Sequence, residues 1–267
     1  MTASPSPRPI PGSTSDIISG PVPGSRSAVL RRLSEMIRPV TLATDRTLPV
    51  ADPLAALLPD GGLARGSLVQ VAGVGATSLG LALLAAGRAA GSWAAVIGLP
   101  ELALVSADEH GVDLDRLVLI DVPRWRRGAE VVAATIDGID LVLLDRRLRF
   151  TASEMRRITA RGREQGSVLI LVEPGLPDAS PSESSGDWSP DLVLTLHSPR
   201  WSGLGSGHGV LRRRHVAIDA VGRGRASRPR HVELLLPDQR GSLAADPLEP
   251  SPDAVIPLSS REHRVAG

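Results

Sequence analysis

The sequence predicts an α/β fold in which a mainly parallel central sheet is flanked by helices and extended by antiparallel strands at its C-terminal end. Three observations predict it. Short apolar runs alternate with helical patterns between residues 68 and 172, which is typical of a parallel sheet covered on both faces. A glycine-rich turn joins the first apolar run to an apolar helix. From residue 192 onward, strands follow one another without helices, as antiparallel strands do.

The composition is that of one sizeable globular domain with polar ends. The chain has 267 residues, 42% of them hydrophobic, and a formal net charge of +1, so no global field draws it to nucleic acid. Without cysteine it can form neither disulfides nor Cys-ligated metal sites. The start lacks an apolar signal-peptide core, and the longest apolar stretch, at 79–90, is too short to span a bilayer. We therefore expect a cytoplasmic protein without a membrane partner.

Changes in composition divide the chain into four regions. Residues 1–25 are rich in Pro, Ser and Gly and are predicted to be a disordered tail. Residues 26–50 hold a short amphipathic helix, Ser27–Arg38, and a linker. Residues 51–237 form the core domain. Residues 238–267 lose hydrophobic periodicity and are predicted to be a flexible tail.

Within the core, each element follows from its local pattern. Buried strands are predicted at 68–72, 94–97, 117–120, 141–144 and 168–172. Helices are predicted from about 79 to 91 and at 102–109, 129–136 and 151–165, the last with Thr151 and Glu154 as a capping box. After a polar loop at 174–190, strands are predicted at 192–196, 213–219 and 231–236.

The turn at 73–78 lies where a nucleotide-binding P-loop would lie. A P-loop reads G-x-x-x-x-G-K-[ST]: its amides cradle phosphates, its Lys reaches the outer phosphates and its hydroxyl holds Mg²⁺. Counting from Gly73 places Ser78 on the second Gly, Leu79 on the Lys and Gly80 on the hydroxyl residue. The pattern therefore indicates a degenerate nucleotide-binding loop. Its remaining glycines are interpreted as making a tight corner, with a generic anion site at the helix N-terminus as the alternative.

The ordered series of segments resembles the ATPase core of RecA recombinases, over residues 54–236. GGLARGSLVQVAG resembles the approach to the RecA P-loop, and HGVDLDRLVLIDVP, at His110–Pro123, resembles the stretch that leads into the next strand. DLVLLDR, at Asp140–Arg146, resembles the strand that carries the Walker B Asp.

This resemblance implies roles for three acidic residues. Asp145 would be the Walker B carboxylate, and Glu101 would match the catalytic Glu if one residue is deleted. Glu173 stands where a sensor amide would be. Each charge-assisted contact missing from the P-loop is worth about 1.5–3 kcal/mol. Neither tight ATP binding nor ATP hydrolysis is therefore expected, and no catalytic residue or cofactor is assigned.

Within the RecA-like group, the degenerate P-loop, the additional N-terminal helix and the different tail resemble the ImuA family, and its actinobacterial ImuA-prime form above all. The resemblance implies a non-catalytic accessory role in DNA-damage-induced, error-prone translesion synthesis during the SOS response. The implied partners are an ImuB-like Y-family polymerase homologue and an error-prone C-family DNA polymerase, with RecA as a further candidate. It also implies association with the nucleoid after DNA damage.

Two alternatives from other classes stay open. One is a divergent RecA-like ATPase acting on single-stranded DNA, which would use Asp145 and Glu101 with an Arg in place of the missing Lys. The other is a SulA-like inhibitor of cell division, which shares the RecA-like ancestry.

An arginine-rich stretch between residues 200 and 230 is a candidate for contact with DNA or a partner. Besides Arg200, the stretch holds the candidate contacts Arg212, Arg213, Arg214, Arg223, Arg225, Arg228 and Arg230, together with Trp201. Arginine binds phosphate bidentately, which suits weak DNA contact, and a solvated face or a surface for an acidic partner is the alternative. Since His208 and His215 lack a third ligand at a suitable spacing, no metal site is predicted. No Ser–His–Asp set follows from spacing alone.

Overall fold

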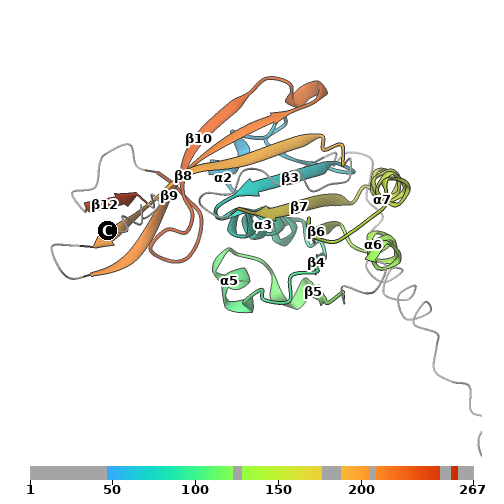
Figure 1. The fold of residues 1–267 in the computed structure, drawn as a ribbon, viewed down its shortest axis with the longest axis horizontal. Helices are drawn as coiled ribbons and strands as arrows, with labels where there is room; N and C mark the ends of the chain where they lie inside the picture. The colour runs from blue at the N-terminus through green and yellow to red at the C-terminus, as the bar shows by residue number, and fades with distance from the viewer. Residues whose placement is uncertain (1–46, 123–127, 176–187, 205–208, 247–253, 258–267) are drawn as a thin grey trace, which may run out of the picture.

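The computed structural model describes residues 47–122, 128–175, 188–204, 209–246 and 254–257 (Figure 1). The tail predicted at 1–25 and the helix predicted at Ser27–Arg38 lie outside these residues. Among the helices of the described part, none has the length and apolar character that a membrane span requires.

One sheet of ten strands dominates the described residues, in the order β11-β10-β9-β8-β3-β7-β6-β4-β5, with β12 paired to β8. The strands are β3 (Leu68–Gly73), β4 (Ala94–Ile97), β5 (Leu117–Ile120), β6 (Leu141–Asp145), β7 (Val168–Pro174), β8 (Leu192–Leu204), β9 (Gly209–Gly222), β10 (Arg230–Leu235), β11 (Ala244–Ala245) and β12 (Ala254–Pro257). Pairing is parallel from β8 across to β5 and antiparallel from β8 to β11. The predicted fold class is therefore confirmed.

Helices cover both faces of the parallel part of the sheet (Figure 1). They are α2 (Asp52–Ala55), α3 (Ala76–Leu84), α4 (Ala86–Ala90), α5 (Leu104–Glu109), α6 (Gly128–Ile136) and α7 (Ala152–Gln165), with short 3-10 turns at Leu114–Arg116 and Gly224–Ala226. A separate two-stranded sheet of β1 (Thr47–Pro49) and β2 (Gly62–Ala64) precedes β3. The predicted capping box at the start of α7 is present.

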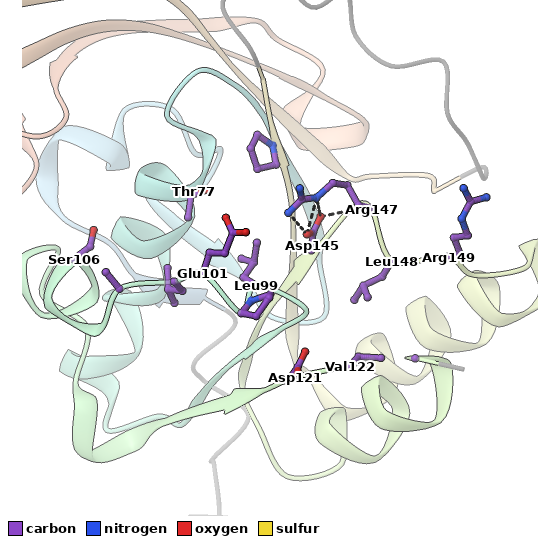
Figure 2. Close-up of a pocket in the computed structure, with 15 residues that line it drawn as sticks. Thr77, Leu99, Glu101, Ser106, Asp121, Val122, Asp145, Arg147, Leu148 and Arg149 are labelled. Atoms are coloured by element: carbon purple, nitrogen blue, oxygen red, sulfur yellow. Dashed lines mark hydrogen bonds and ion pairs between the residues drawn. The ribbon is translucent and has the colours of Figure 1, made fainter. Parts of the chain in front are cut away.

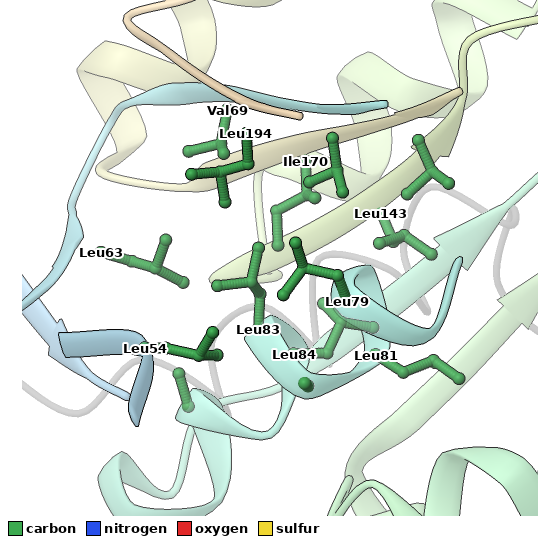
Figure 3. Close-up of a cluster of buried hydrophobic side chains, with 14 of the residues drawn as sticks. Leu54, Leu63, Val69, Leu79, Leu81, Leu83, Leu84, Leu143, Ile170 and Leu194 are labelled. Carbon is green, nitrogen blue, oxygen red and sulfur yellow. The ribbon is translucent and has the colours of Figure 1, made fainter. Parts of the chain in front are cut away.

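Alternate side chains of the central strands supply two hydrophobic cores. Leu141 and Leu143 of β6 belong to the core that α3 covers, whereas Val142 and Leu144 belong to the core of α6 and α7. Figure 3 shows the first core, in which the leucines of α3 pack between the helix and strands β3, β6, β7 and β8. Strands buried on both faces need nearly continuous apolar sequence, and this requirement made the parallel strands predictable.

The helix predicted from 79 to 91 differs from the observed one. The observed helix begins earlier, at Ala76, and is divided into α3 and α4 at Ala85. Gly87 brings α4 close to the sheet, because a Cβ at this position would lie 2.7 Å from Leu141 Cδ1. The end near Gly91 agrees, since Gly91 adopts φ 63° as a left-handed C-cap.

Two of the antiparallel strands, β8 and β9, are longer than predicted. Instead of ending near residue 196, β8 continues to Leu204, and β9 runs antiparallel to it from Gly209, so that the two form a ribbon beyond the parallel sheet (Figure 1). The additional residues are rich in Gly, Ser and Arg. Because strands were predicted from apolar runs, these residues were not predicted to be strand.

The described domain also extends past both predicted boundaries, 51 and 237. β1 lies before the first boundary and pairs with β2. β11 and β12 lie within 238–267, the predicted flexible tail, and pair with β10 and β8. Strands of two to four residues are too short to show an alternation of hydrophobic and polar residues. They were therefore identified from their backbone pairing in the structure.

Candidate functional site

The loop between β3 and α3 is shorter than a P-loop. β3 ends at Gly73 and α3 begins at Ala76, so Val74 and Gly75 alone connect strand and helix. Since a P-loop lies between its strand and its helix, the start of α3 aligns Gly75, Ala76 and Thr77 with G-K-[ST]. In this register the Lys position holds an alanine, whereas a threonine hydroxyl is retained.

The residues that counting from Gly73 had placed on the Lys and hydroxyl positions lie elsewhere. Leu79 is fully buried in the core beneath α3 (Figure 3). Gly80 faces the sheet so closely that a Cβ would lie 2.6 Å from Leu143 Cδ1 and 2.9 Å from Val172 Cγ2. Ser78 is half-buried in the first turn of α3. Leu79 and Gly80 therefore serve the packing of α3 on the sheet.

Asp145 lies at the carboxyl end of β6, as the Walker B comparison implied, but an arginine two residues later holds it. Its side chain is 4% exposed and accepts hydrogen bonds from the Arg147 backbone amide (2.8 Å) and from Nε (2.8 Å), with Nη2 at 2.7 Å. This pairing raises the pKa of Arg147. Of the three arginines that follow β6 in sequence, Arg147 is thus the partner of Asp145.

Glu173, at the sensor position, is likewise paired. Arg146 Nε lies 3.0 Å from its Oε2, and Gln70 Nε2 donates to the same oxygen at 3.3 Å. Gln70 also accepts from Arg146 Nη1 at 3.4 Å. The acidic groups at the ends of β6 and β7 are therefore neutralised by adjacent arginines.

A pocket of about 810 Å³ opens beside these groups, at the carboxyl ends of the parallel strands (Figure 2). Ligands of open α/β sheets bind at this end. Thr77 of α3, Glu101 after β4 and Asp145 line it together, with Arg147 bonded to Asp145 and Arg149 also in the lining. The structure thus brings Glu101 to the same pocket as Asp145, although 44 residues separate them in sequence.

Arg214, grouped by sequence with the candidate DNA contacts, lies inside the protein. It is 8% exposed, and its guanidinium lies against the loop: a Cβ on Gly75 would be 2.5 Å from Arg214 Nη2. Trp201, its cross-strand partner, places its ring centroid 5.6 Å from Arg214 Cζ. Both residues therefore belong to the loop's surroundings. The sequence carried no signal for this, because the contact joins positions 139 residues apart.

The other candidate arginines do not form one surface. Arg212 and Arg213 lie in the distal half of β9, whereas Arg223, Arg225, Arg228 and Arg230 follow its other end, roughly 30 Å along the strand. Arg223 and Arg225 lie in the turn between β9 and β10, where they form ion pairs with Asp191 and Asp60.

A Ser–His–Asp set that sequence spacing did not reveal joins β8, β9 and the segment after β11. Ser202 Oγ lies 3.1 Å from His215 Nε2, and His215 Nδ1 lies 2.7 Å from Asp246 Oδ2. Ser202 is 1% exposed, so a substrate has no access to its hydroxyl. The set therefore fastens Asp246 to the ribbon. Among the described residues, no three His, Asp or Glu side chains are placed to hold a metal ion.

Two sequence comparisons with known proteins show which family the chain belongs to. A family model described as the MT3502 N-terminal domain matches residues 56–178. The uncharacterized protein Rv3395c of Mycobacterium tuberculosis is 34% identical over 152 residues, which make up 57% of this chain and 71% of that protein. The chain belongs to the Rv3395c family.

Among solved structures, the fold of this Rv3395c family member is similar to that of the RadB recombinase. The TM-score is 0.51 at 14% identity, and the match covers 73% of this chain and 97% of the recombinase. The core thus has a RecA-like fold, and β3 and α3 lie on either side of the loop at the P-loop position. The residues here do not fit a triphosphate bound in the way that a P-loop binds it. The loop is too short, and it carries no cation of its own.

Proposed function

We propose that this protein is a RecA-like accessory protein without nucleotide chemistry, which acts through protein contacts in DNA-damage-induced, error-prone translesion synthesis. In this proposal it is an adaptor of the ImuA-prime type. Its partners are an ImuB-like Y-family polymerase homologue and an error-prone C-family polymerase, with RecA as a further candidate. It works in the cytoplasm and joins the nucleoid after DNA damage.

The shortened loop is the observation that carries the proposal. With two residues between Gly73 and Ala76, the loop lacks the run of amides that surrounds phosphates in a P-loop. The pairing of Asp145 with Arg147 supports the same conclusion, because a carboxylate that already accepts several hydrogen bonds is a poor ligand for Mg²⁺. A RecA-like scaffold that keeps its fold without these groups retains its surfaces for binding partners.

The partner proposal is tested by affinity capture with purified ImuB-like and C-family polymerase proteins. We expect full-length protein to retain at least one of them, and deletion of residues 1–40 or 247–267 to weaken retention. The second deletion begins after Asp246, because residues up to that point pair with the sheet. Full retention by both truncated forms would show that the contact lies elsewhere, and failure of the full-length protein to bind either polymerase would refute the adaptor role.

A divergent ATPase is the second candidate, favoured by one arrangement. Thr77, Glu101 and Asp145 line one pocket, and Arg214 places a guanidinium beside Gly75, where it could stand in for the missing Lys. Calorimetric titration with ATP and Mg²⁺ separates the candidates. Binding tighter than micromolar, or ATP turnover lost in Asp145→Asn and Glu101→Gln, would favour the enzyme over the adaptor.

A further inference from the structure

Arg214 packs against the former P-loop in an unusually close contact. Gly75 has φ 97° and is the N-cap of α3, and three guanidinium atoms of Arg214 lie within 3.0 Å of the place where its Cβ would be. The guanidinium is held from behind by a hydrogen bond from Nε to the carbonyl of Leu236 and by the Trp201 ring. The side chain is thus fixed between β9 and the loop.

The rest of the loop is closed by backbone. The Gly175 amide donates to the Gly73 carbonyl at 3.0 Å, and a Cβ on Gly175 would lie 2.9 Å from Gly73 Cα. On the other side, the Leu196 carbonyl oxygen would lie 2.5 Å from a Cβ on Gly73. Protein atoms therefore fill three sides of the space where amides of a P-loop would face phosphate oxygens.

The electrostatics of this contact are unfavourable as it stands. The N-terminus of α3 carries partial positive charge and no side-chain cap, and Arg214 faces it with a full positive charge. Arg214 Nη2 is buried and has no hydrogen-bond partner among the described residues. Burial lowers the pKa of Arg214, and no carboxylate contributes to that shift. Such a charge either binds an anion that enters the loop or is held in place by the packing around it.

The packing distinguishes these two possibilities. Nη2 has essentially no solvent exposure, so an oxyanion cannot reach it unless the side chain moves. Movement would break the bond to the Leu236 carbonyl and the contact with Trp201. We infer that Arg214 is a built-in plug, a guanidinium from the antiparallel extension that fills the former phosphate loop and excludes oxyanions from it. The inference rests on the proposed function and deepens it, because a protein whose loop is filled by Arg214 does not bind ATP or ADP there.

A double-mutant cycle in the full chain tests the contact. Gly75→Ala adds backbone strain and a clash with the guanidinium, whereas in the Arg214→Ala background the strain remains and the clash is removed. We expect Gly75→Ala to lower Tm by at least about 3 °C more in the wild type than in Arg214→Ala. If Arg214→Ala does not fold, Arg214→Met retains the apolar stem and leaves a flexible end that can yield. Equal Tm losses in the two backgrounds would overturn the plug.

Titration with inorganic phosphate, pyrophosphate and Mg²⁺–ATP tests exclusion. We expect none of these to raise the Tm of the wild type or of Arg212→Ala, a matched control at an exposed position on the same strand. A rise in wild-type Tm that disappears in Arg214→Ala but persists in Arg212→Ala would overturn the inference, since Arg214 would then be a ligand-binding cation. Capture of the polymerases is a separate measurement, so failure of the adaptor role would leave this result intact.

Discussion

Asp145 and Arg147 form a forked ion pair at the carboxyl end of β6, with Arg147 Nε and Nη2 at 2.8 and 2.7 Å from Asp145 Oδ2. The two partners differ in burial: the Asp145 side chain is 4% exposed and that of Arg147 is 69% exposed. The pair occupies the edge of the sheet where a RecA-like ATPase would hold its metal ion. The arginine therefore decides whether this carboxylate is available to a ligand.

The two halves of this pair are expected to respond unequally to substitution. Arg147→Ala leaves a buried carboxylate with the backbone amide of residue 147 as its remaining donor, so we expect a loss of about 1–3 kcal/mol in the free energy of unfolding. Asp145→Asn leaves a solvated arginine and is expected to cost less. Urea unfolding of both variants measures this, and a larger loss in Asp145→Asn would contradict it.

Adding a hydroxyl at Gly80 is expected to harm the fold and leave nucleotide binding unchanged. The new side chain would press on Leu143 and Val172, which we expect to destabilise the protein by about 1–3 kcal/mol. Ser78→Ala, two residues earlier on α3 and half-buried, serves as the control and should change stability by less than about 0.5 kcal/mol. Thermal unfolding of Gly80→Ser at wild-type Tm would show that α3 can move away from the sheet.

His110 is expected to make stability depend on pH. It is 8% exposed, and burial lowers its pKa from the ordinary value, against a smaller opposing effect of the hydrogen bond to the Ser106 carbonyl. Below about pH 6.5 the unfolded chain binds a proton that the folded chain refuses, so folding stability falls with falling pH until the lowered pKa is reached.

This loss can be measured by urea unfolding at pH 7.5 and pH 5.5. We expect wild-type stability to fall more between these values than that of His110→Gln, because carboxylates contribute equally to both proteins and cancel. The difference can reach about 1.4 kcal/mol per pH unit below 6.5. An identical fall in both proteins would assign the acid sensitivity to other groups.

Asp246 is expected to fasten the segment after β10 to the ribbon. Asp246→Ala removes its bond to His215 Nδ1, and we expect a loss of about 1–3 kcal/mol together with faster amide hydrogen exchange in β11. His231, which bonds to Asp219 on the exposed face of β9 and β10, offers a matched control as His231→Ala. Unchanged exchange in β11 would indicate that strand pairing alone holds it.

Contact with DNA, if present, is expected at the distal ribbon. Arg223 and Arg225 already pair with Asp191 and Asp60, whereas Arg212 is exposed and Arg213 donates to the neutral Gln239. We expect Arg212→Ala with Arg213→Ala to weaken retention on single-stranded DNA and to lower the salt slope by about one per lost contact. A larger effect of Arg223→Ala with Arg225→Ala would place the contact at the turn.

Local pattern alone determined the parallel half of this fold. The strands at Leu141–Asp145 and Val168–Pro174 are buried on both faces, and such burial demands continuous apolar sequence that can be read without a structure. The same reading placed Asp145 at a strand end and Thr151 at a helix cap.

Tertiary structure decided the state of the site. Counting residues from Gly73 could not show that α3 begins at Ala76, because the length of the loop between β3 and α3 depends on how the helix packs against the sheet. The approach of Arg214 to Gly75 and the bond between His215 and Asp246 join distant residues through the pairing of strands β8 to β11. Sequence carries the propensity of each segment, whereas contacts between segments exist once backbone pairing has set their register.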